Sequence, residues 1–391
     1  MWQDIKNIYH FFISILANLI YGFPARSLTV IGVTGTDGKT TTSNIIYHIL
    51  QNSKRSTSII STVGASIGDK NYEVGFHVTT PSSFKLQSFL RKAKDKGSSY
   101  FVLEVTSHAL DQNRVFGIPF KVGVLTNITN EHLDYHKTYE QYLKTKASLL
   151  KSSKVAIVNR DDRSYEKVLR IIRGHTRIIS YGLSKKADVK PDLFNLEEFG
   201  MEENFNKYNL LAAISACKVL GLKDDEIKKA LKSFELPKGR LETVYDKEFR
   251  VVVDFAHTPN AFLQVLSSLK GKAKGRIIHV FGSAGKRDKK KRPEMGRLSS
   301  EFSDLIVLTS EDPRSEDPEE IMDQIERGIE KREKVRKIAN RRDAIRFAIQ
   351  SAKPGDIVIV TGKSHEKSMN YGRGEEPWDE FEEVQKALRT I

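Results

Sequence analysis

The sequence predicts an α/β protein of two domains, each built around a mostly parallel β-sheet, behind an amphipathic N-terminal helix. Its 391 residues are enough for two or three domains. Hydrophobic residues make up 39% and charged residues 29% of the chain, close to the averages of globular proteins. Short β-branched runs alternate with helical stretches, a pattern typical of parallel sheets that are covered on both faces.

The first 27 residues are expected to form the amphipathic helix. Its apolar stretch, Ile8 to Phe23, is interrupted by polar residues and is shorter than the ~20 residues that cross a bilayer. At helical spacing, one face carries Ile8, Phe11, Phe12, Ile15, Leu16 and Leu19, and the other carries Asn7, His10, Ser14, Asn18 and Tyr21. Asp4 argues against a secretory signal. Two alternatives stay open: the helix packs on its own domain, or it lies in a membrane interface with Trp2 and Tyr9 near the headgroups.

A central domain is expected over residues 28–238 and a C-terminal domain over residues 239–391, because Pro237-Lys238-Gly239 breaks the alternation. Predicted strands of the first are Leu28–Val33, Thr57–Ser61, Tyr100–Val105, Val122–Thr126, Val155–Val158 and Arg177–Ser180, followed by helices at Asn206–Leu220 and Asp224–Phe234. Predicted strands of the second are Arg250–Asp254, Arg276–Phe281, Asp304–Thr309 and Asp356–Thr361.

The net charge of +14 indicates an anionic partner. Charge alone does not distinguish nucleic acid, an anionic membrane and a phosphorylated small molecule. The single cysteine, Cys217, excludes an intrachain disulfide and a cysteine-ligated zinc or iron–sulfur site. It falls in an apolar helical pattern, so a packed side chain in a reducing, cytoplasmic compartment is expected.

A phosphate-binding loop is indicated where the first predicted strand meets the following helix. In the segment TVIGVTGTDGKTTT (residues 29–42), glycines let backbone N–H groups close around phosphates, Lys39 neutralises charge and Thr40 can bind Mg²⁺. Gly32 and Gly38 are six positions apart, one more than in the common pattern. The expected binding residues for ATP or GTP are Gly35, Thr36, Asp37, Gly38, Lys39, Thr40 and Thr41.

Three nearby segments carry candidate catalytic side chains. Glu104 ends a predicted strand, where a carboxylate suits Mg²⁺. His132 follows the carboxyl end of the next strand, the edge at which open α/β sheets bind ligands. Lys146 lies in a predicted helix, and composition alone predicts that its side chain is solvated.

Ordered motifs across residues 28–391 resemble those of the Mur ligases, and within that family the branch that adds the third residue of the peptidoglycan stem peptide. The motifs are GTDGKTTT, HVTTP, LEVTSHALDQNRV, TNITNEHLDYH, YLKTKASLL, FNKYNLLAA, PKGRLE, VVVDFAHTPNA, FGSAGKRDKKKRPEMG, LTSEDPRSEDP and TGKSHE. The resemblance implies an ATP-dependent amide ligase. A carboxylate of a muramoyl dipeptide attacks the γ-phosphate, and the amine of a diamino acid then attacks the acyl phosphate, with two domains closing over one nucleotide.

The resemblance also implies roles for individual residues. Lys39 would contact the phosphates, Thr40 and Glu104 one Mg²⁺, and His132 a second. Lys146 matches a lysine that the family carries as N6-carboxylysine, an anion that orients or binds Mg²⁺. Further ATP contacts are expected from Asn206, Asn209, Arg240, Asp254 and His257. The muramoyl peptide would be held by Thr79, Thr80, Ser107 and Arg114.

The amine is expected to be meso-diaminopimelate rather than lysine. Residues 311–314 read E-D-P-R where the diaminopimelate-adding branch has D-N-P-R, and Arg314 offers a planar fork to the distal carboxylate. The expected pocket contains Arg287, Asp312, Arg314, Gly362 and Glu366. One alternative remains open, that Arg314 pairs with Asp312, Glu316 or Asp317 instead.

The resemblance departs at the N-terminus, because the family has a separate domain there that binds uridine diphosphate, and about 27 residues precede the first predicted strand. Three forms of the acceptor therefore stay open: one without UDP, one linked to a lipid, and one held by the central domain alone. Rival functions are a folylpolyglutamate-synthase-like ligase, an inactive membrane adaptor and a nucleic-acid-binding NTPase that uses the basic run at residues 286–292. No stacking motif accompanies that run, so no nucleic-acid partner is expected. The expected location is the cytoplasm, with contact at the inner membrane face left open.

Overall fold

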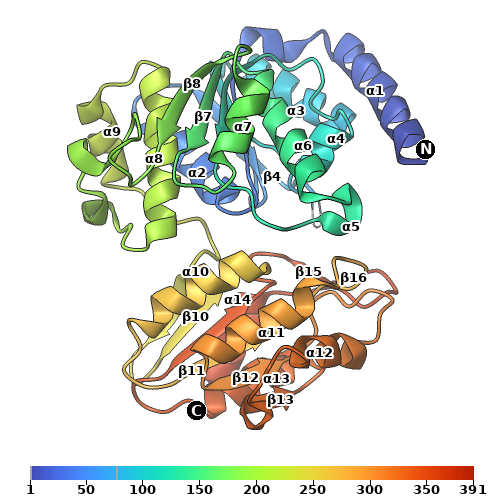
Figure 1. The fold of residues 1–391 in the computed structure, drawn as a ribbon, viewed down its shortest axis with the longest axis vertical. Coiled ribbons are helices and arrows are strands. Elements are labelled where there is room, and N and C mark those ends of the chain that lie inside the picture. The colour runs from blue at the N-terminus through green and yellow to red at the C-terminus, as the bar shows by residue number, and fades with distance from the viewer. Residues whose placement is uncertain (1, 76–77) are drawn as a thin grey trace. The chain divides into compact units, whose positions relative to one another are not determined.

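The structure, a computed structural model, describes residues 2–75 and 78–391 (Figure 1). His77 of the HVTTP motif lies outside the described residues. The chain forms two compact units. Unit 1 runs to Asn130 and continues over His136–Glu235, and unit 2 comprises Glu131–Tyr135 and Leu236–Ile391. The expected division after residue 238 falls close to this boundary.

Unit 1 is built on an eight-stranded sheet of order β4-β3-β2-β5-β1-β6-β7-β8. The strands are β1 (Thr29–Thr34), β2 (Thr57–Ser61), β3 (Gly64–Ile67), β4 (Lys70–Tyr72), β5 (Tyr100–Glu104), β6 (Phe120–Leu125), β7 (Val155–Asn159) and β8 (Arg177–Tyr181). In this spatial order, every neighbouring pair from β2 through β5, β1, β6 and β7 to β8 is parallel, which confirms the predicted sheet. At the other edge, β2 pairs with β3 and β3 with β4 in antiparallel fashion. The sequence did not reveal β3 and β4, which are short and carry little apolar signal.

Helices cover both faces of this sheet. They are α2 (Lys39–Asn52), α3 (Ser83–Asp95), α4 (Ser107–Asp111), α6 (Tyr139–Lys151), α7 (Tyr165–Ile172), α8 (Asn204–Val219) and α9 (Asp224–Leu231), with the short α5 (Leu133–His136) shared between the units. Leu86 and Phe89 of α3 share one core with Val30 and Phe101. The two predicted late helices are confirmed as α8 and α9, and Cys217 is buried in α8, where burial raises the pKa of its thiol.

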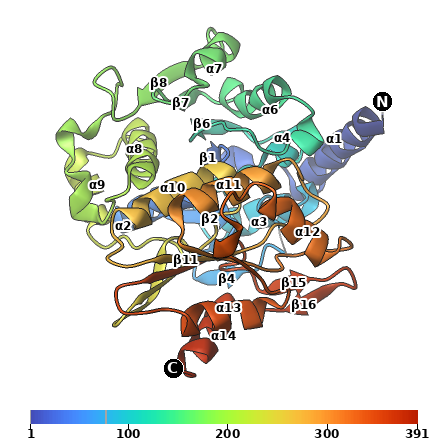
Figure 2. The same cartoon turned by 60° about the horizontal axis from the view of Figure 1, so that its bottom comes forward.

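Unit 2 holds a second, mostly parallel sheet of order β13-β12-β11-β14-β10-β9. Its strands are β9 (Glu242–Asp246), β10 (Arg250–Asp254), β11 (Ile277–Phe281), β12 (Leu305–Leu308), β13 (Val335–Lys337) and β14 (Ile357–Thr361), with a hairpin of β15 (Ser368–Asn370) and β16 (Glu375–Pro377). In Figure 2, α10 (Pro259–Lys270) and α11 (Lys291–Phe302) lie over one face, and α13 (Arg341–Gln350) and α14 (Glu380–Leu388) over the other. Helix α12 (Pro318–Glu326) packs beside α11. The four strands predicted here are confirmed.

The predicted N-terminal helix is confirmed as α1 (Trp2–Tyr21), which is followed by a short 3₁₀ turn at Pro24–Ser27. It belongs to unit 1 and packs against α3. The side chain of Trp2 lies outside the description. Across residues 2–75 and 78–391, no helix combines the length and the apolarity needed to cross a membrane.

Candidate active site

The predicted phosphate loop lies between the carboxyl end of β1 and the first turn of α2. Gly35 and Gly38 have φ values of +150° and +80°, which side-chain-bearing residues rarely adopt. A Cβ atom on Gly35 would lie 1.8 Å from Thr126 Oγ1, and one on Gly38 would lie 2.1 Å from Asn209 Oδ1. Both glycines are therefore required by conformation and by space.

The segment after β6 holds this loop in place. The backbone N–H of Thr36 donates to the Asn127 carbonyl at 2.9 Å, and that of Asp37 to Asn127 Oδ1 at 3.0 Å. Thr126 Oγ1 donates to the Asp37 carbonyl at 2.6 Å. Lys39 Nζ donates to the Thr36 carbonyl at 2.8 Å, so its ammonium stays at the loop, where phosphates would bring negative charge.

Glu104, at the end of β5, lies beside the first turn of α2. Thr40 Oγ1 donates to its two carboxylate oxygens at 3.1 and 3.0 Å, and Thr62 donates through its N–H and its hydroxyl, both at 2.9 Å. Hydroxyl and carboxylate oxygens fit Mg²⁺. The described residues contain no cluster of three His, Cys, Asp or Glu side chains that could hold a metal ion by themselves.

The prediction of a solvated Lys146 from composition is wrong. The side chain is 1% exposed, because Tyr142, Lys146 and Ala147 all lie on the face of α6 that packs against the sheet. Its Nζ donates to the Gly35 carbonyl at 2.6 Å and lies 4.6 Å from the centroid of the Tyr142 ring. The amine is thus held against the phosphate loop.

The residues expected to hold the muramoyl peptide also gather in unit 1. Thr79 Oγ1 lies 3.0 Å from Thr62 Oγ1, and Thr80 Oγ1 donates to the Glu104 carbonyl at 2.9 Å. Arg114 Nη1 donates to the Thr80 carbonyl at 2.9 Å. Ser107 is buried at the start of α4, and its hydroxyl is among the buried polar atoms that have no hydrogen-bond partner in the described structure. These contacts form a continuous chain from the cluster of Thr40, Thr62 and Glu104 to Arg114.

The two predicted asparagines of α8 lie on the other side of the loop. Asn209 Oδ1 accepts from Thr42 Oγ1 at 3.4 Å, and Asn209 Nδ2 donates to Asn206 Oδ1 at 3.5 Å. Both asparagines are buried, as is Thr41 in the first turn of α2. Unit 1 therefore brings the loop, Glu104, Lys146 and both asparagines into one constellation.

In unit 2, the remaining nucleotide-binding candidates surround Phe255, just after β10. The Asp254 carboxylate accepts from the N–H groups of Leu241 and Ala256, each at 2.7 Å, and the Arg240 guanidinium lies 4.7 Å from the Phe255 ring centroid. His257 Nδ1 lies 2.8 Å from the Phe255 carbonyl oxygen. Burial, with help from the neighbouring Lys291 cation, lowers the pKa of His257 to about 3, so its imidazole is neutral at physiological pH.

His132 belongs to the part of the chain grouped with unit 2, and its φ is +56°. Beside it in sequence, Glu131 accepts from Lys291 at 3.0 Å, and Lys291 also donates to the His257 carbonyl at 2.8 Å. In the same basic run, Lys289 and Arg292 pair with Glu316 at 3.0 and 2.9 Å. These pairings commit three cations of the run to carboxylates.

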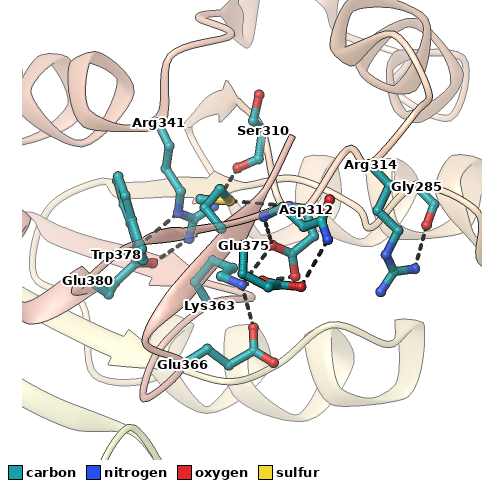
Figure 3. Close-up of polar contacts among 12 residues, drawn as sticks. Gly285, Ser310, Asp312, Arg314, Arg341, Lys363, Glu366, Glu375, Trp378 and Glu380 are labelled. Atoms are coloured by element: carbon teal, nitrogen blue, oxygen red, sulfur yellow. Dashed lines mark hydrogen bonds and ion pairs between the residues drawn. The ribbon is translucent and has the colours of Figure 1, made fainter. Parts of the chain in front are cut away.

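The predicted amine pocket holds a buried ionic cluster that Figure 3 shows. Lys363 Nζ donates to both oxygens of Asp312 at 2.9 Å and to Glu366 at 2.6 Å. Within the part of the chain that the structure describes, Arg314 forms no ion pair with Asp312, Glu316 or Asp317, so that alternative is wrong. Its Nη1 donates to the Gly285 carbonyl at 2.7 Å, and its guanidinium points away from the Asp312 carboxylate (Figure 3). The reason is that Lys363 occupies Asp312.

The backbone around this cluster is unusual. Asp312 and Arg314 have φ values of +44° and +54°, a costly conformation that is found at ligand sites. Burial and then the Arg314 cation lower the pKa of Arg287, which indicates that the two guanidinium groups lie near one another. A Cβ on Gly362 would lie 2.3 Å from Glu311 Oε2, and burial raises the pKa of Glu311 to about 7.

Sequence reasoning missed several residues that build these clusters. Thr62, Asn127, Lys291 and Lys363 all contact predicted site residues. Asn127, Lys291 and Lys363 lie within the motifs TNITNEHLDYH, FGSAGKRDKKKRPEMG and TGKSHE, so these motifs could have indicated them. Thr62 follows β2 and had no such signal, because only the parallel pairing of β2 with β5 brings it to Glu104.

Comparison with protein families matches both units. Residues 33–222 match the Mur ligase middle domain, and residues 239–364 match the Mur ligase, glutamate ligase domain. The chain is 36% identical over 399 residues to the UDP-N-acetylmuramoyl-L-alanyl-D-glutamate–2,6-diaminopimelate ligase of Clostridium botulinum, covering 97% of this chain and 82% of that protein. It is 39% identical over 391 residues to the enzyme of that name from Aquifex aeolicus, covering 95% and 80%.

Solved structures of related proteins also match this chain. A structure of a UDP-N-acetylmuramoyl-L-alanyl-D-glutamate–2,6-diaminopimelate ligase matches with a TM-score of 0.60 and 30% identity, covering 93% of this chain and 78% of that one. The folylpolyglutamate synthase of Mycobacterium tuberculosis, with a TM-score of 0.71 and 16% identity over 90% of this chain and 92% of that one, shares the fold alone.

Proposed function

This chain belongs to the Mur ligase family of ATP-dependent ligases, and we propose that it joins meso-diaminopimelate to a muramoyl dipeptide through an acyl phosphate. The observation that carries this proposal is the near full-length similarity to diaminopimelate ligases. The placement of Arg314, clear of Asp312, supports the choice of amine.

Unit 1 supplies the groups for acyl phosphate formation. The N–H groups of the Gly35–Gly38 loop and the Lys39 ammonium hold the phosphates of ATP, while Arg114 and Thr80 orient the dipeptide carboxylate toward the γ-phosphate. Thr40 and Glu104 would hold Mg²⁺, which would offset the negative charge of the phosphates. By the family match, Asn206 and Asn209 of unit 1 and Arg240, Asp254 and His257 of unit 2 would contact the nucleotide, and His132 would serve a second Mg²⁺.

Lys146 is proposed to carry an N6-carboxyl group. The uncharged Lys146 amine attacks carbon dioxide and releases one proton to solvent, which gives an anionic carbamate. Against the phosphate loop, this anion would suit Mg²⁺ better than a buried ammonium group. Support comes from the burial of Lys146 and from its contact with the loop carbonyl of Gly35.

The amine pocket is proposed to read two ends of the diamino acid. Arg314, with Arg287 near it, binds the distal carboxylate, and Glu366 with the backbone of Gly362 receives the amino end. Asp312 does not repel that carboxylate, because the Lys363 ammonium neutralises it. The proposal places the enzyme in the cytoplasm, in peripheral contact with the inner membrane face through α1.

The test compares meso-diaminopimelate with lysine at saturating ATP, using muramoyl-dipeptide acceptors with and without UDP. The wild type should prefer diaminopimelate. Arg314→Ala should raise the KM for diaminopimelate by roughly 30-fold, equivalent to about 2 kcal/mol, while the turnover of lysine changes little. Arg346→Ala, at an exposed arginine of α13, is the control. A wild-type preference for lysine, or unchanged discrimination in Arg314→Ala, contradicts the assignment.

A further inference from the structure

Helix α1 is attached to unit 1 by its polar side. Asn7 Nδ2 donates to Asp111 Oδ2 at 3.0 Å, Ser14 Oγ donates to the Asn113 carbonyl at 2.7 Å, and Asn18 Nδ2 donates to the Phe116 carbonyl at 2.9 Å. Ser14 Oγ also lies 2.7 Å from Ser83 Oγ on α3. Ser14 and Asn18 are fully buried. The face that normally meets water is thus the face that meets the protein.

The apolar side of α1 is left in solvent. Six side chains on it are between 47% and 62% exposed: Ile8, Tyr9, Phe12, Leu16, Leu19 and Ile20. At 100° per residue they fall within an arc of about 120°, a continuous stripe roughly 18 Å long. Phe116, which is also exposed, extends the stripe through an edge contact with Phe11 at 4.7 Å between ring centroids. Of the eleven large hydrophobic side chains exposed in the described residues, seven lie in this patch.

This arrangement is the reverse of an ordinary surface helix, whose apolar face turns to the core. Exposed apolar patches of this size mark interaction sites in soluble proteins. The partner must therefore offer an apolar surface to a convex helix.

The charges around α1 favour an anionic partner. Helix α3, which packs against α1, exposes Lys85, Arg91, Lys92 and Lys94, and Asp95 is its one acidic residue. Arg91 pairs with Asp95 at 2.9 Å and Lys85 donates to the Val74 carbonyl at 2.7 Å, so Lys92 and Lys94 contribute most of the positive charge that α3 offers to a partner. The whole chain carries +14. An apolar helix face beside exposed cations matches a bilayer whose headgroups are negative and whose acyl chains begin just below them.

We propose that α1 lies in the interface of an anionic phospholipid membrane, with its Ile8–Ile20 stripe inserted and the basic side chains of α3 at the headgroups. This deepens the peripheral contact included in the proposed function. Asp111, Asn113 and Phe116, which hold α1, share their segment with Ser107 and Arg114. The acceptor-binding part of unit 1 is therefore tied directly to the membrane-bound helix.

The test is co-sedimentation of the full chain with vesicles of phosphatidylcholine containing about one quarter phosphatidylglycerol, at low salt. The wild type should bind these vesicles, bind pure phosphatidylcholine more weakly, and lose affinity as salt rises. Phe12→Glu with Leu16→Glu should weaken binding by about 30-fold or more. Both side chains face solvent, so the fold should persist, which circular dichroism checks.

The matched control is Leu263→Glu with Ile391→Glu, which places the same charges at exposed apolar residues of unit 2 and should leave vesicle binding unchanged. ATP-dependent ligation without vesicles should be the same in all three proteins, so failure of the membrane proposal is separate from failure of the ligase proposal. Absence of binding to anionic vesicles, or equal binding by the α1 variant, overturns the inference. So does a concentration-dependent dimer that the α1 variant abolishes, because a second copy then covers the stripe.

Discussion

At the scale of single residues, substitution of Lys146 tests whether its buried side chain has a structural or a chemical role. Lys146→Ala removes the proposed carboxylated side chain that contacts the phosphate loop at Gly35, and ligation should fall roughly 10- to 100-fold, as for other groups that orient metal ligands. Short carboxylic acids should restore part of the activity by filling the vacated place. Lys144→Ala, at an exposed position of the same helix, should be unaffected. A folded Lys146→Ala protein with full activity, or one that no acid rescues, speaks against the carbamate.

The sequence predicts the position of a residue well where a local motif determines it. It fails where the environment of a side chain depends on contacts with residues that are distant in the chain. The loop residues Gly35–Thr41 lie where the pattern placed them, because a strand, a glycine turn and a helix are local features. Lys146 was misjudged, and the ion pair of Asp312 with Lys363 was not foreseen. Their environments come from Gly35 and Lys363, which are 111 and 51 positions away in the chain. No local pattern reports such contacts.

At the scale of elements, the sequence specifies central strands better than edges. The apolar runs in β1 and β5, and in β6 after the exposed Lys121, are typical of strands that are buried on both faces. The strands β3, β4, β9, β13, β15 and β16 were missed, because each has only three to five residues and, in all but β15, at least half of the residues are partly or fully exposed. For α1, the residue pattern predicts an apolar and a polar face but not which of the two packs against the domain. That choice depends on the partners Asp111, Ser83 and Asn113.

The junction of the phosphate loop with α2 gives an element-scale prediction. Gly38→Ala should abolish ATP-dependent phosphate release, because its Cβ would lie 2.1 Å from Asn209 Oδ1 and would push α8 from the loop. Gly174→Ala is the matched control: its φ is +81°, close to the +80° of Gly38, but nothing lies within 4 Å. It should cost about 1–2 kcal/mol of stability from backbone strain and leave phosphate release unchanged. Equal losses of activity in the two variants would mean that strain, not the Asn209 contact, is responsible.

At the scale of the whole molecule, unit 2 should be the acid-sensitive part. Burial is the leading cause that lowers the pKa of His257, His279 and His365 to about 3 in the folded chain, from an ordinary value of 6.5. Between these two pH values the unfolded chain binds protons that the folded chain does not, so the free energy of unfolding is highest above pH 6.5 and falls as the solution is acidified. For the fully buried His279, which lies between Ser299 and Thr361, the loss of unfolding free energy from pH 7 to pH 5 is about 2 kcal/mol.

Urea unfolding followed by Trp378 fluorescence in a Trp2→Phe background reports on unit 2, since these are the two tryptophans of the chain. His279→Gln should flatten the pH dependence even if it lowers stability overall, whereas His175→Gln, at an exposed histidine, should preserve the slope. If wild type and His279→Gln lose stability in parallel on acidification, the neutral histidine in the sheet core is not the source of the acid sensitivity.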